Sequence, residues 1–345
     1  MAEQKAKGKK QAARQKGKGL DVGTAFIVCA EQKGDVVSFR SQRDGFFDVE
    51  YGEFAREMLT RAGVNYIQKG DSLYVVGNEA LEFANVFNRE MRRPLRSGVL
   101  SPTEREALPM VELVIQRVIG EPSEPGEIAY FSVPDRPVDA ELDTVYHEKI
   151  VQEMLSKLGY EPKPINEGLA VVFSELADEN FTGIGLSLGS GLVNMCLSFM
   201  SVPVVSFSVT RAGDWIDHQV AMAMAETATR ICAIKESTFD LTKTEGVSRI
   251  EKALSIYYDA LIDYVLAHMK RELEASERTP RVQKPLTIIL SGGSAMPKGF
   301  QPRFEERLRA TSLPVPIGEV RLVAQPLYSV AKGALVAARA DESKR

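Results

Sequence analysis

The chain has 345 residues, of which 44% are hydrophobic and 26% charged, and its formal net charge is −4. This length and composition are typical of one large or two medium globular domains. No apolar run approaches the ~18 residues of a membrane-spanning helix, and the first nineteen residues lack the apolar stretch of a signal peptide. We therefore expect a cytoplasmic protein without a transmembrane segment.

The cysteines point to the same compartment. Cys29, Cys196 and Cys232 lie far apart in apolar surroundings. An odd count at such spacing indicates buried free thiols in a reducing environment rather than a disulfide framework.

Basic charge is concentrated at the N-terminus. Residues 1–19 carry seven basic side chains and one acidic one, a net charge of +6, whereas residues 20–345 carry −10. Because this segment has almost no apolar side chain to bury, we expect a disordered tail. The tail is either a solvated extension or a contact for an anionic partner, such as nucleic acid, lipid headgroups or an acidic protein.

The folded part is expected to begin at Leu20. A strand over 20–28 is broken by a glycine turn, and Ser101, Pro102 and Glu104 have the pattern of a capped helix start. The other elements of this half are expected as strands at 35–39, 73–76, 128–133 and 163–166, and as helices at 52–62, 140–158 and 167–177.

The pattern then begins again. The second half is expected to contain a strand–turn–strand hairpin at 183–199, strands at 202–209, 286–290 and 320–322, and helices at 215–231, 247–274, 300–310 and 327–340. The repeated order predicts a duplicated α/β domain.

Two glycine-rich turns occupy corresponding places in the two halves. The first contains Gly23 and Thr24, and the second contains Gly189, Ser190 and Gly191. A strand–glycine turn–strand hairpin directs backbone N–H groups into a concavity that suits phosphate oxygens. Two such turns facing each other would hold a polyphosphate from both sides, so the sequence predicts a nucleotide cleft.

Seven segments in order resemble the superfamily of actin, heat-shock chaperones and sugar kinases, and most closely its bacterial actin-like proteins of the MreB and MamK type. The matching segments are 19–24, 93–100, 165–170, 187–191, 211–217, 290–295 and 325–333. The resemblance implies an α/β fold of two RNase H-like domains, the actin-like ATPase fold, with a nucleotide cleft between them. It divides the chain into the basic tail (1–19), domain I (20–166, closed by a helix in 323–345) and domain II (167–322).

The resemblance also implies roles for particular residues. Asp21 would hold Mg²⁺ through water, and Glu167 would position the water that attacks the γ-phosphate, so these two are the expected catalytic residues. The residues expected to contact ATP or GTP are Gly23, Thr24, Gly189, Ser190, Gly191, Gly213, Asp214, Lys235, Gly292, Gly293 and Ser294.

The second turn departs from the superfamily pattern. Ser187 stands where the superfamily has an aspartate, and Leu192 stands where it has a threonine. The glycines that would bind phosphate are retained, but a metal-facing carboxylate is lost. We therefore expect nucleotide binding with weak, slow or absent hydrolysis, and the sequence leaves open whether the chain is an ATPase.

Two functions are compatible with these features. The leading interpretation is an actin-like protein that binds nucleotide and assembles with itself into cytoskeletal filaments, since a head-to-tail contact that does not close gives a filament. The alternative is a degenerate chaperone-like nucleotide-binding module that acts as a non-polymerising regulator or scaffold. The substitutions at Ser187 and Leu192 favour the alternative.

Overall fold

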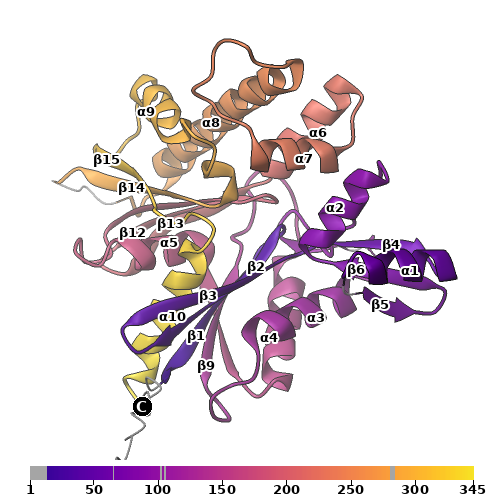
Figure 1. The fold of residues 1–345 in the computed structure, drawn as a ribbon. Helices are drawn as coiled ribbons and strands as arrows, with labels where there is room; N and C mark the ends of the chain where they lie inside the picture. Colours follow the sequence, from indigo (N-terminus) through magenta and orange to yellow (C-terminus); the bar gives the residue numbers. More distant parts are fainter. Residues whose placement is uncertain (1–13, 65, 102, 105, 280–283) are drawn as a thin grey trace, which may run out of the picture.

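Two five-stranded sheets of the same topology form the two halves of the molecule (Figure 1). The computed structural model describes residues 14–64, 66–101, 103–104, 106–279 and 284–345. The strand order is β10-β9-β1-β2-β3 in the first half and β13-β12-β11-β14-β15 in the second. In each half the first three strands are antiparallel neighbours. Two further strands, parallel to the first, continue the sheet on the other side of that first strand. The expected duplication is therefore confirmed.

The strands of the first sheet are Arg14–Val22 (β1), Phe26–Lys33 (β2), Val36–Arg43 (β3), Ile128–Val133 (β9) and Glu161–Asn166 (β10). Those of the second sheet are Gly183–Leu188 (β11), Val193–Phe199 (β12), Val202–Val209 (β13), Leu286–Ser291 (β14) and Ile317–Leu322 (β15). Most of these strands lie where alternating or continuous apolar runs predicted them.

A smaller unit is inserted after β3. It contains a three-stranded sheet and helices at the right of Figure 1. Its elements are Phe46–Glu50 (β4), Glu53–Arg61 (α1), Tyr66–Lys69 (β5), Ser72–Val76 (β6), Asn78–Val86 (α2), Leu95–Arg96 (β7) and Val99–Leu100 (β8).

The remaining helices cover the sheets. They are Ala107–Ile119 (α3), Thr144–Lys157 (α4), Glu167–Glu175 (α5), Gly213–Met224 (α6), Ala228–Ser237 (α7), Arg249–Ala275 (α8), Phe300–Ala310 (α9) and Ser329–Glu342 (α10). Helices α5 and α10 lie against each other, α10 also packing on β1 and β9 and α5 on β11 and β12. The pair of α5 and α10 therefore connects the two halves, at the point where the chain passes from the first half to the second.

A second connection between the two halves runs along the edge of β13. Residues 135–139, which follow β9, run beside β13 of the other half through a parallel bridge between Pro137 and Ser208. The Val138 N–H donates to the Ser208 carbonyl at 3.0 Å, and the Ser208 hydroxyl donates to the Asp135 carbonyl at 2.7 Å. The edge of β13 is thereby covered by the opposite half.

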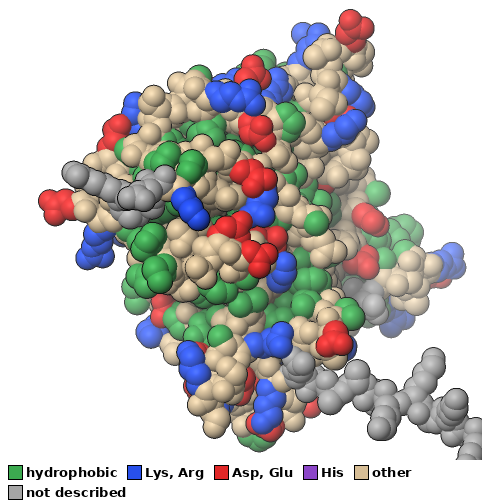
Figure 2. Space-filling view, turned by 90° about the vertical axis from the view of Figure 1, so that its left-hand side faces the viewer, with side chains coloured by type: hydrophobic (Ala, Val, Ile, Leu, Met, Phe, Trp, Pro, Cys, Tyr) green, Lys and Arg blue, Asp and Glu red, His purple; other side chains and the backbone are tan. Residues whose placement is uncertain are grey.

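None of the helices in the described ranges is long and apolar enough to cross a bilayer. The cysteines Cys29, Cys196 and Cys232 are free and buried, as predicted. On the face seen in Figure 2, basic and acidic side chains lie close to one another rather than gathering by sign.

The structure corrects the bounds of the N-terminal tail. Residues 1–13 lie outside the described ranges, but residues 14–19 belong to β1. The Lys18 side chain is fully buried, and its ammonium donates to the carbonyls of Ile119 (2.5 Å) and Glu121 (3.2 Å) and to the Tyr160 hydroxyl (2.6 Å). The expectation failed because a lysine is predicted to be solvated unless its partners in the folded chain are known.

Two helix predictions also need correction. Helix α3 begins at Ala107, not at Ser101, because Glu104 binds Arg92 instead of closing a capping box; Pro102 lies outside the described residues. The helix expected over 215–231 is two helices, α6 and α7. The break is at Ala225, whose backbone is left-handed (φ 55°). An alanine does not predict this conformation, which glycine adopts far more readily.

The burial of Lys18 generates a prediction. Lys18→Met keeps the apolar stem but removes the charged donor, which leaves the carbonyls at the end of α3 without it, so the free energy of unfolding should fall by about 2–3 kcal/mol. Urea unfolding measures the change. Lys16→Met is the control, since it removes only an exposed ion pair with Glu124 and should leave the midpoint nearly unchanged. Equal effects of both changes would contradict this account.

Candidate functional site

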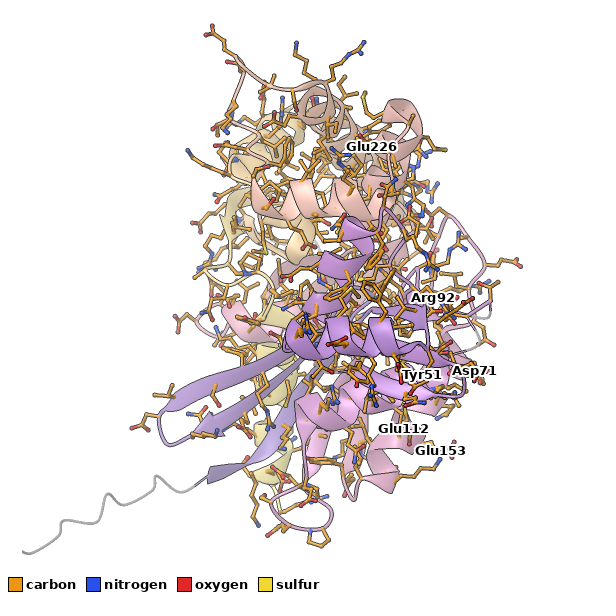
Figure 3. All side chains as sticks on the ribbon, turned by 45° about the vertical axis from the view of Figure 1, so that its right-hand side comes forward. Tyr51, Asp71, Arg92, Glu112, Glu153 and Glu226 are labelled. Atoms are coloured by element: carbon orange, nitrogen blue, oxygen red, sulfur yellow. The ribbon has the colours of Figure 1, made fainter. Side chains whose placement is uncertain are left out.

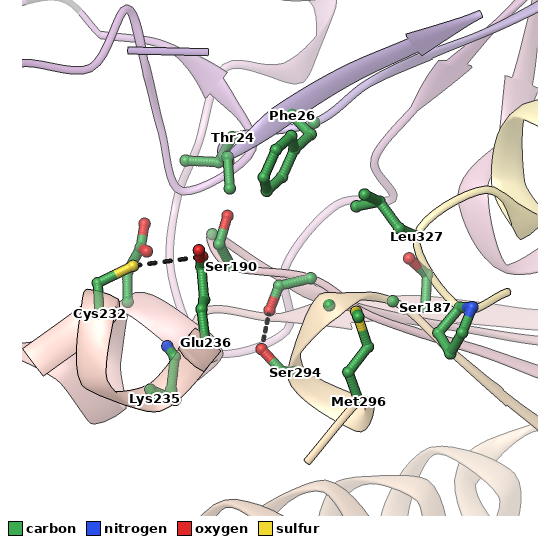
Figure 4. Close-up of a pocket in the computed structure, with 18 of the residues that line it drawn as sticks. Thr24, Phe26, Ser187, Ser190, Cys232, Lys235, Glu236, Ser294, Met296 and Leu327 are labelled. Atoms are coloured by element: carbon green, nitrogen blue, oxygen red, sulfur yellow. Dashed lines mark hydrogen bonds between the residues drawn. The ribbon is translucent and has the colours of Figure 1, made fainter. Parts of the chain in front are cut away.

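A cavity of about 360 Å³ lies between the two halves, within the size range of small-molecule sites. Figure 4 shows side chains from both halves around it, with Thr24 and Phe26 opposite Lys235 and Glu236. Of the predicted residues only Gly213 does not line the cavity. Those that do are Asp21, Gly23, Thr24, Glu167, Gly189, Ser190, Gly191, Asp214, Lys235, Gly292, Gly293 and Ser294.

The two glycine turns have the same local geometry and face each other. The Gly23 N–H donates to the Phe26 carbonyl at 3.1 Å, and the Gly189 N–H donates to the Leu192 carbonyl at 3.0 Å. The turns approach so closely that a Cβ atom at Gly191 would lie 2.2 Å from the Thr24 hydroxyl. Only glycine fits at this point, and residues of both turns line the cavity.

Two carboxylates form the floor of the cavity. Ser132 donates to Asp21 at 2.8 Å, and Ser187 donates to Glu167 at 3.0 Å. Burial raises the pKa of Asp21 to about 7, and burial together with repulsion from Asp21 raises the pKa of Glu167 to about 8. The serine hydrogen bonds oppose both shifts.

This floor fits a hydrated divalent cation. Among the described residues no basic side chain acts on the pKa of either acid, and a cation next to phosphate would supply positive charge here. Among the described residues no group of three or more His, Cys, Asp or Glu side chains could hold a metal. Mg²⁺ does not need such a group, because it keeps several waters and binds through one or two carboxylates plus phosphates.

The predicted residues on the nucleoside side are already engaged. Lys235 donates to Asp217 at 2.7 Å and to the Gly213 carbonyl at 3.0 Å; burial opposes its charge, but Asp217 raises the pKa of Lys235. Asp214 pairs with Arg93 at 2.7 Å, and Ser294 donates to the Gly189 carbonyl at 2.8 Å. These contacts position the side chains, and their contact with a nucleoside stays a prediction.

Gly292 and Gly293 have different tasks. Gly292 has a φ of +92°, and a Cβ atom there would lie 2.3 Å from the Leu188 carbonyl oxygen, so it serves the turn after β14. A Cβ atom at Gly293 would meet nothing within 4 Å. Gly293 is therefore the position where a larger side chain would enter the cavity without disturbing the backbone.

Several lining residues were not among the predicted ones, notably Phe26, Arg93 and Glu236. Arg93 lies in a segment, 93–100, that resembles the superfamily, so a signal was present. Glu236 forms an ion pair with Arg43, whose guanidinium also lies 4.4 Å from the centre of the Phe26 ring. No sequence pattern indicates that contact.

Comparisons with known proteins agree with this architecture. A family model described as Volactin matches residues 17–338. No curated protein matches the sequence.

Three solved structures show the same fold. The MamK double helical filament is 19% identical, with a TM-score of 0.70 over 93% of this chain and 98% of that one. MreB 5 of Spiroplasma citri bound to AMPPNP is 13% identical, with a TM-score of 0.68 over 95% and 97%. The ethanolamine utilization protein EutJ from Carboxydothermus hydrogenoformans is 15% identical, with a TM-score of 0.55 over 93% and 89%. The predicted actin-like fold is therefore confirmed.

The acid pair predicts a pH dependence of stability. Both carboxyl groups bind protons more tightly in the folded chain than in the unfolded one, so stability falls as the pH rises from about 4.5 to about 8. Glu167→Gln cannot ionise and should remove its share of this loss. Its melting temperature should exceed the parent's by at least ~2 °C at pH 8.5, with a smaller difference at pH 5.

Thermal melts without divalent cations, at the two pH values, measure this difference. Glu112→Gln, on the exposed face of α3, controls for the loss of one surface charge. A gain for Glu167→Gln that is the same at pH 5 and pH 8.5 would show that the pKa of Glu167 is not raised in the folded chain.

Proposed function

Because the chain belongs to the Volactin family, we propose that it is an actin-like protein that binds a purine nucleotide in the cleft and assembles with itself into filaments. The observation that carries the proposal is the pair of glycine turns facing each other above Asp21 and Glu167. Backbone N–H groups on two sides and paired carboxylates below suit a polyphosphate with its cation.

The nucleotide would lie along the cavity. Its phosphates would lie in the cavity beside the two turns, which Gly23, Thr24 and Gly189–Gly191 line. Its base would extend toward α7 and Gly293, where the wall is formed by Lys235, Glu236 and Met296. The MamK and MreB 5 structures with AMPPNP, and MreB5 with ADP, support an adenine nucleotide over GTP.

When bound, Mg²⁺ would neutralise phosphate charge over the two carboxylates. Asp21 would hold its waters, and Glu167 would orient the attacking water. Ser187 leaves the second turn without an acid of its own, so we propose that hydrolysis is slow.

Self-assembly is the second half of the proposal. The similarity to a MamK filament supports it over a non-polymerising module, and a head-to-tail repeat gives a filament when its rotation does not close. We propose that assembly takes place in the cytoplasm, where buried free thiols such as these are stable. The domain bounds near residues 166 and 322, and an anionic partner for the N-terminal segment, stay predictions.

Calorimetry and sedimentation together test the proposal. The parent should bind ATP, and high-speed sedimentation should pellet it in a nucleotide-dependent way. Gly293→Val should weaken binding at least ~10-fold because its side chain enters the cavity, and it should pellet less at limiting ATP.

The two methods separate the two parts of the proposal. Absence of ATP and GTP binding at millimolar concentration would refute the nucleotide site. Binding without pelleting under any condition would favour the non-polymerising regulator or scaffold.

The serine of the second turn gives a further prediction. Ser187→Asp restores a carboxylate next to Glu167, so phosphate release with Mg²⁺ and ATP should rise about 10- to 100-fold. Ser187→Ala is the control, because it removes the hydroxyl without adding an acid and should give no gain. A parent turnover of about 1–100 s⁻¹, the range of ordinary kinases, would show that the missing acid is unimportant.

A further inference from the structure

An extended segment of the inserted unit, residues 90–93, is fixed to its own half of the molecule. The Phe46 N–H donates to the Arg92 carbonyl at 2.8 Å, and the Arg92 N–H donates to the Phe46 carbonyl at 2.9 Å. The Arg92 guanidinium pairs with Asp48 at 2.8 Å and with Glu104 at 2.5 Å. Figure 3 shows Arg92 on this unit, with Glu226, which precedes α7, above it on the other half.

The neighbours of Arg92 reach across to α7 in the other half. The Glu90 carboxylate accepts from the Ala228 N–H at 2.9 Å, from the Thr229 N–H at 3.1 Å and from the Thr229 hydroxyl at 2.6 Å. The Met91 N–H donates to the Thr229 hydroxyl at 2.9 Å.

These contacts complete the N-terminal cap of α7. The first N–H groups of a helix have no partner within the helix, and a negative charge beside them is favourable. The hydroxyl of the helix's own cap residue, Thr227, accepts from the Arg230 N–H at 3.2 Å. Glu90 takes the two N–H groups before it, so the cap of α7 is shared between the two halves.

Two ion pairs hold the same region. Arg93 pairs with Asp214, the second residue of α6, at 2.7 Å. Arg43 pairs with Glu236 near the other end of α7, and the Arg43 side chain is only 4% exposed. Helix α7 is therefore tied to the opposite half at both of its ends.

Helix α7 also forms one wall of the cavity, through Cys232, Lys235 and Glu236. Because the opposite half forms the facing wall, separation of the two halves would open the cavity. Separation would remove the partner of the Ala228 and Thr229 N–H groups and would divide both ion pairs.

We propose that residues 90–93 form an interdomain latch, in which Glu90 positions α7 over the nucleoside and slows nucleotide release. The release step rests on the proposed function, whereas the latch itself does not. Glu90 is a positioning residue, since it acts through α7 and does not line the cavity.

The first experiment measures cleft opening without nucleotide. Spin labels at Phe54→Cys on α1 and Met222→Cys on α6 occupy exposed sites on the two halves, and the three native cysteines are buried. The latch predicts a narrow distance distribution by pulsed electron paramagnetic resonance in the labelled parent. Glu90→Ala should broaden and lengthen it, and Glu82→Ala, an exposed change on α2, should not.

The second experiment measures release of a fluorescent N-methylanthraniloyl-ADP, chased with excess ADP. Glu90→Ala should release it about five- to tenfold faster, the effect of losing a helix cap. Thr229→Val removes the hydroxyl that binds both Glu90 and Met91 and should act similarly. The double variant should be little faster than either single one, because both changes break the same contact.

The Thr227→Ala variant separates the latch from a purely structural role of the cap. Thr227→Ala weakens the cap of α7 from within its own half. It should lower the melting temperature as much as Glu90→Ala does, while the label distances stay narrow.

The outcomes distinguish the latch from the proposed function. If the parent binds no nucleotide but Glu90→Ala lengthens the label distances, the nucleotide site is wrong and the latch stands. If the distances are the same in Glu90→Ala and the parent, the latch is overturned. Multiplicative effects of Glu90→Ala and Thr229→Val on release would overturn the coupling through α7.

Discussion

The contact between α5 and α10 is the constraint on which the rest of the structure depends. A Cβ atom at Gly19 of β1 would lie 2.1 Å from the Ala331 carbonyl oxygen of α10, and one at Gly333 would lie 1.7 Å from the Ala170 carbonyl oxygen of α5. A Cβ atom at Gly168 would lie 2.6 Å from the Cys196 nitrogen of β12. The first sheet, α10, α5 and the second sheet therefore pack with their backbones in direct contact. A side chain at any of these three glycines would prevent such a close approach.

This close packing fixes the geometry of the site. Asp21 is the penultimate residue of β1, next to the first glycine turn, and Glu167 is the first residue of α5. The two carboxylates are therefore carried by elements within the packed centre. Side chains on such elements cannot move apart to relieve their repulsion. The raised pKa values of both groups follow from that rigidity, because desolvation and proximity are imposed by the packing and not by the acids. The positions of the two carboxyl groups are thereby set before any ligand binds.

The sequence contained most of the information about this centre and little about its periphery. The glycine turns, Asp21 and Glu167 could be predicted because backbone geometry restricts residue type there, and the structure brings them to one cavity. The partners of Lys18 and the cap that Glu90 supplies to α7 could not, since both depend on residues about 100 or more positions away. An exposed glutamate and a buried lysine have the same local pattern as any solvated charge.

The departures in the second turn are better understood as an exchange than as a loss. Leu192 is 3% exposed and packs against Gly98 of the opposite half, where a Cβ atom would lie 2.5 Å from the Leu192 methyl carbon. A threonine hydroxyl at this position would need a partner in that apolar contact. Ser187, in turn, donates to Glu167, where an aspartate would place a further buried carboxyl group beside this acid. The leucine therefore packs across the cleft, whereas the serine holds Glu167 in place within one half. The second turn thus gains an apolar contact and a hydrogen bond where the superfamily pattern has a charge, which is the physical basis for the proposal that nucleotide is held longer than it is turned over.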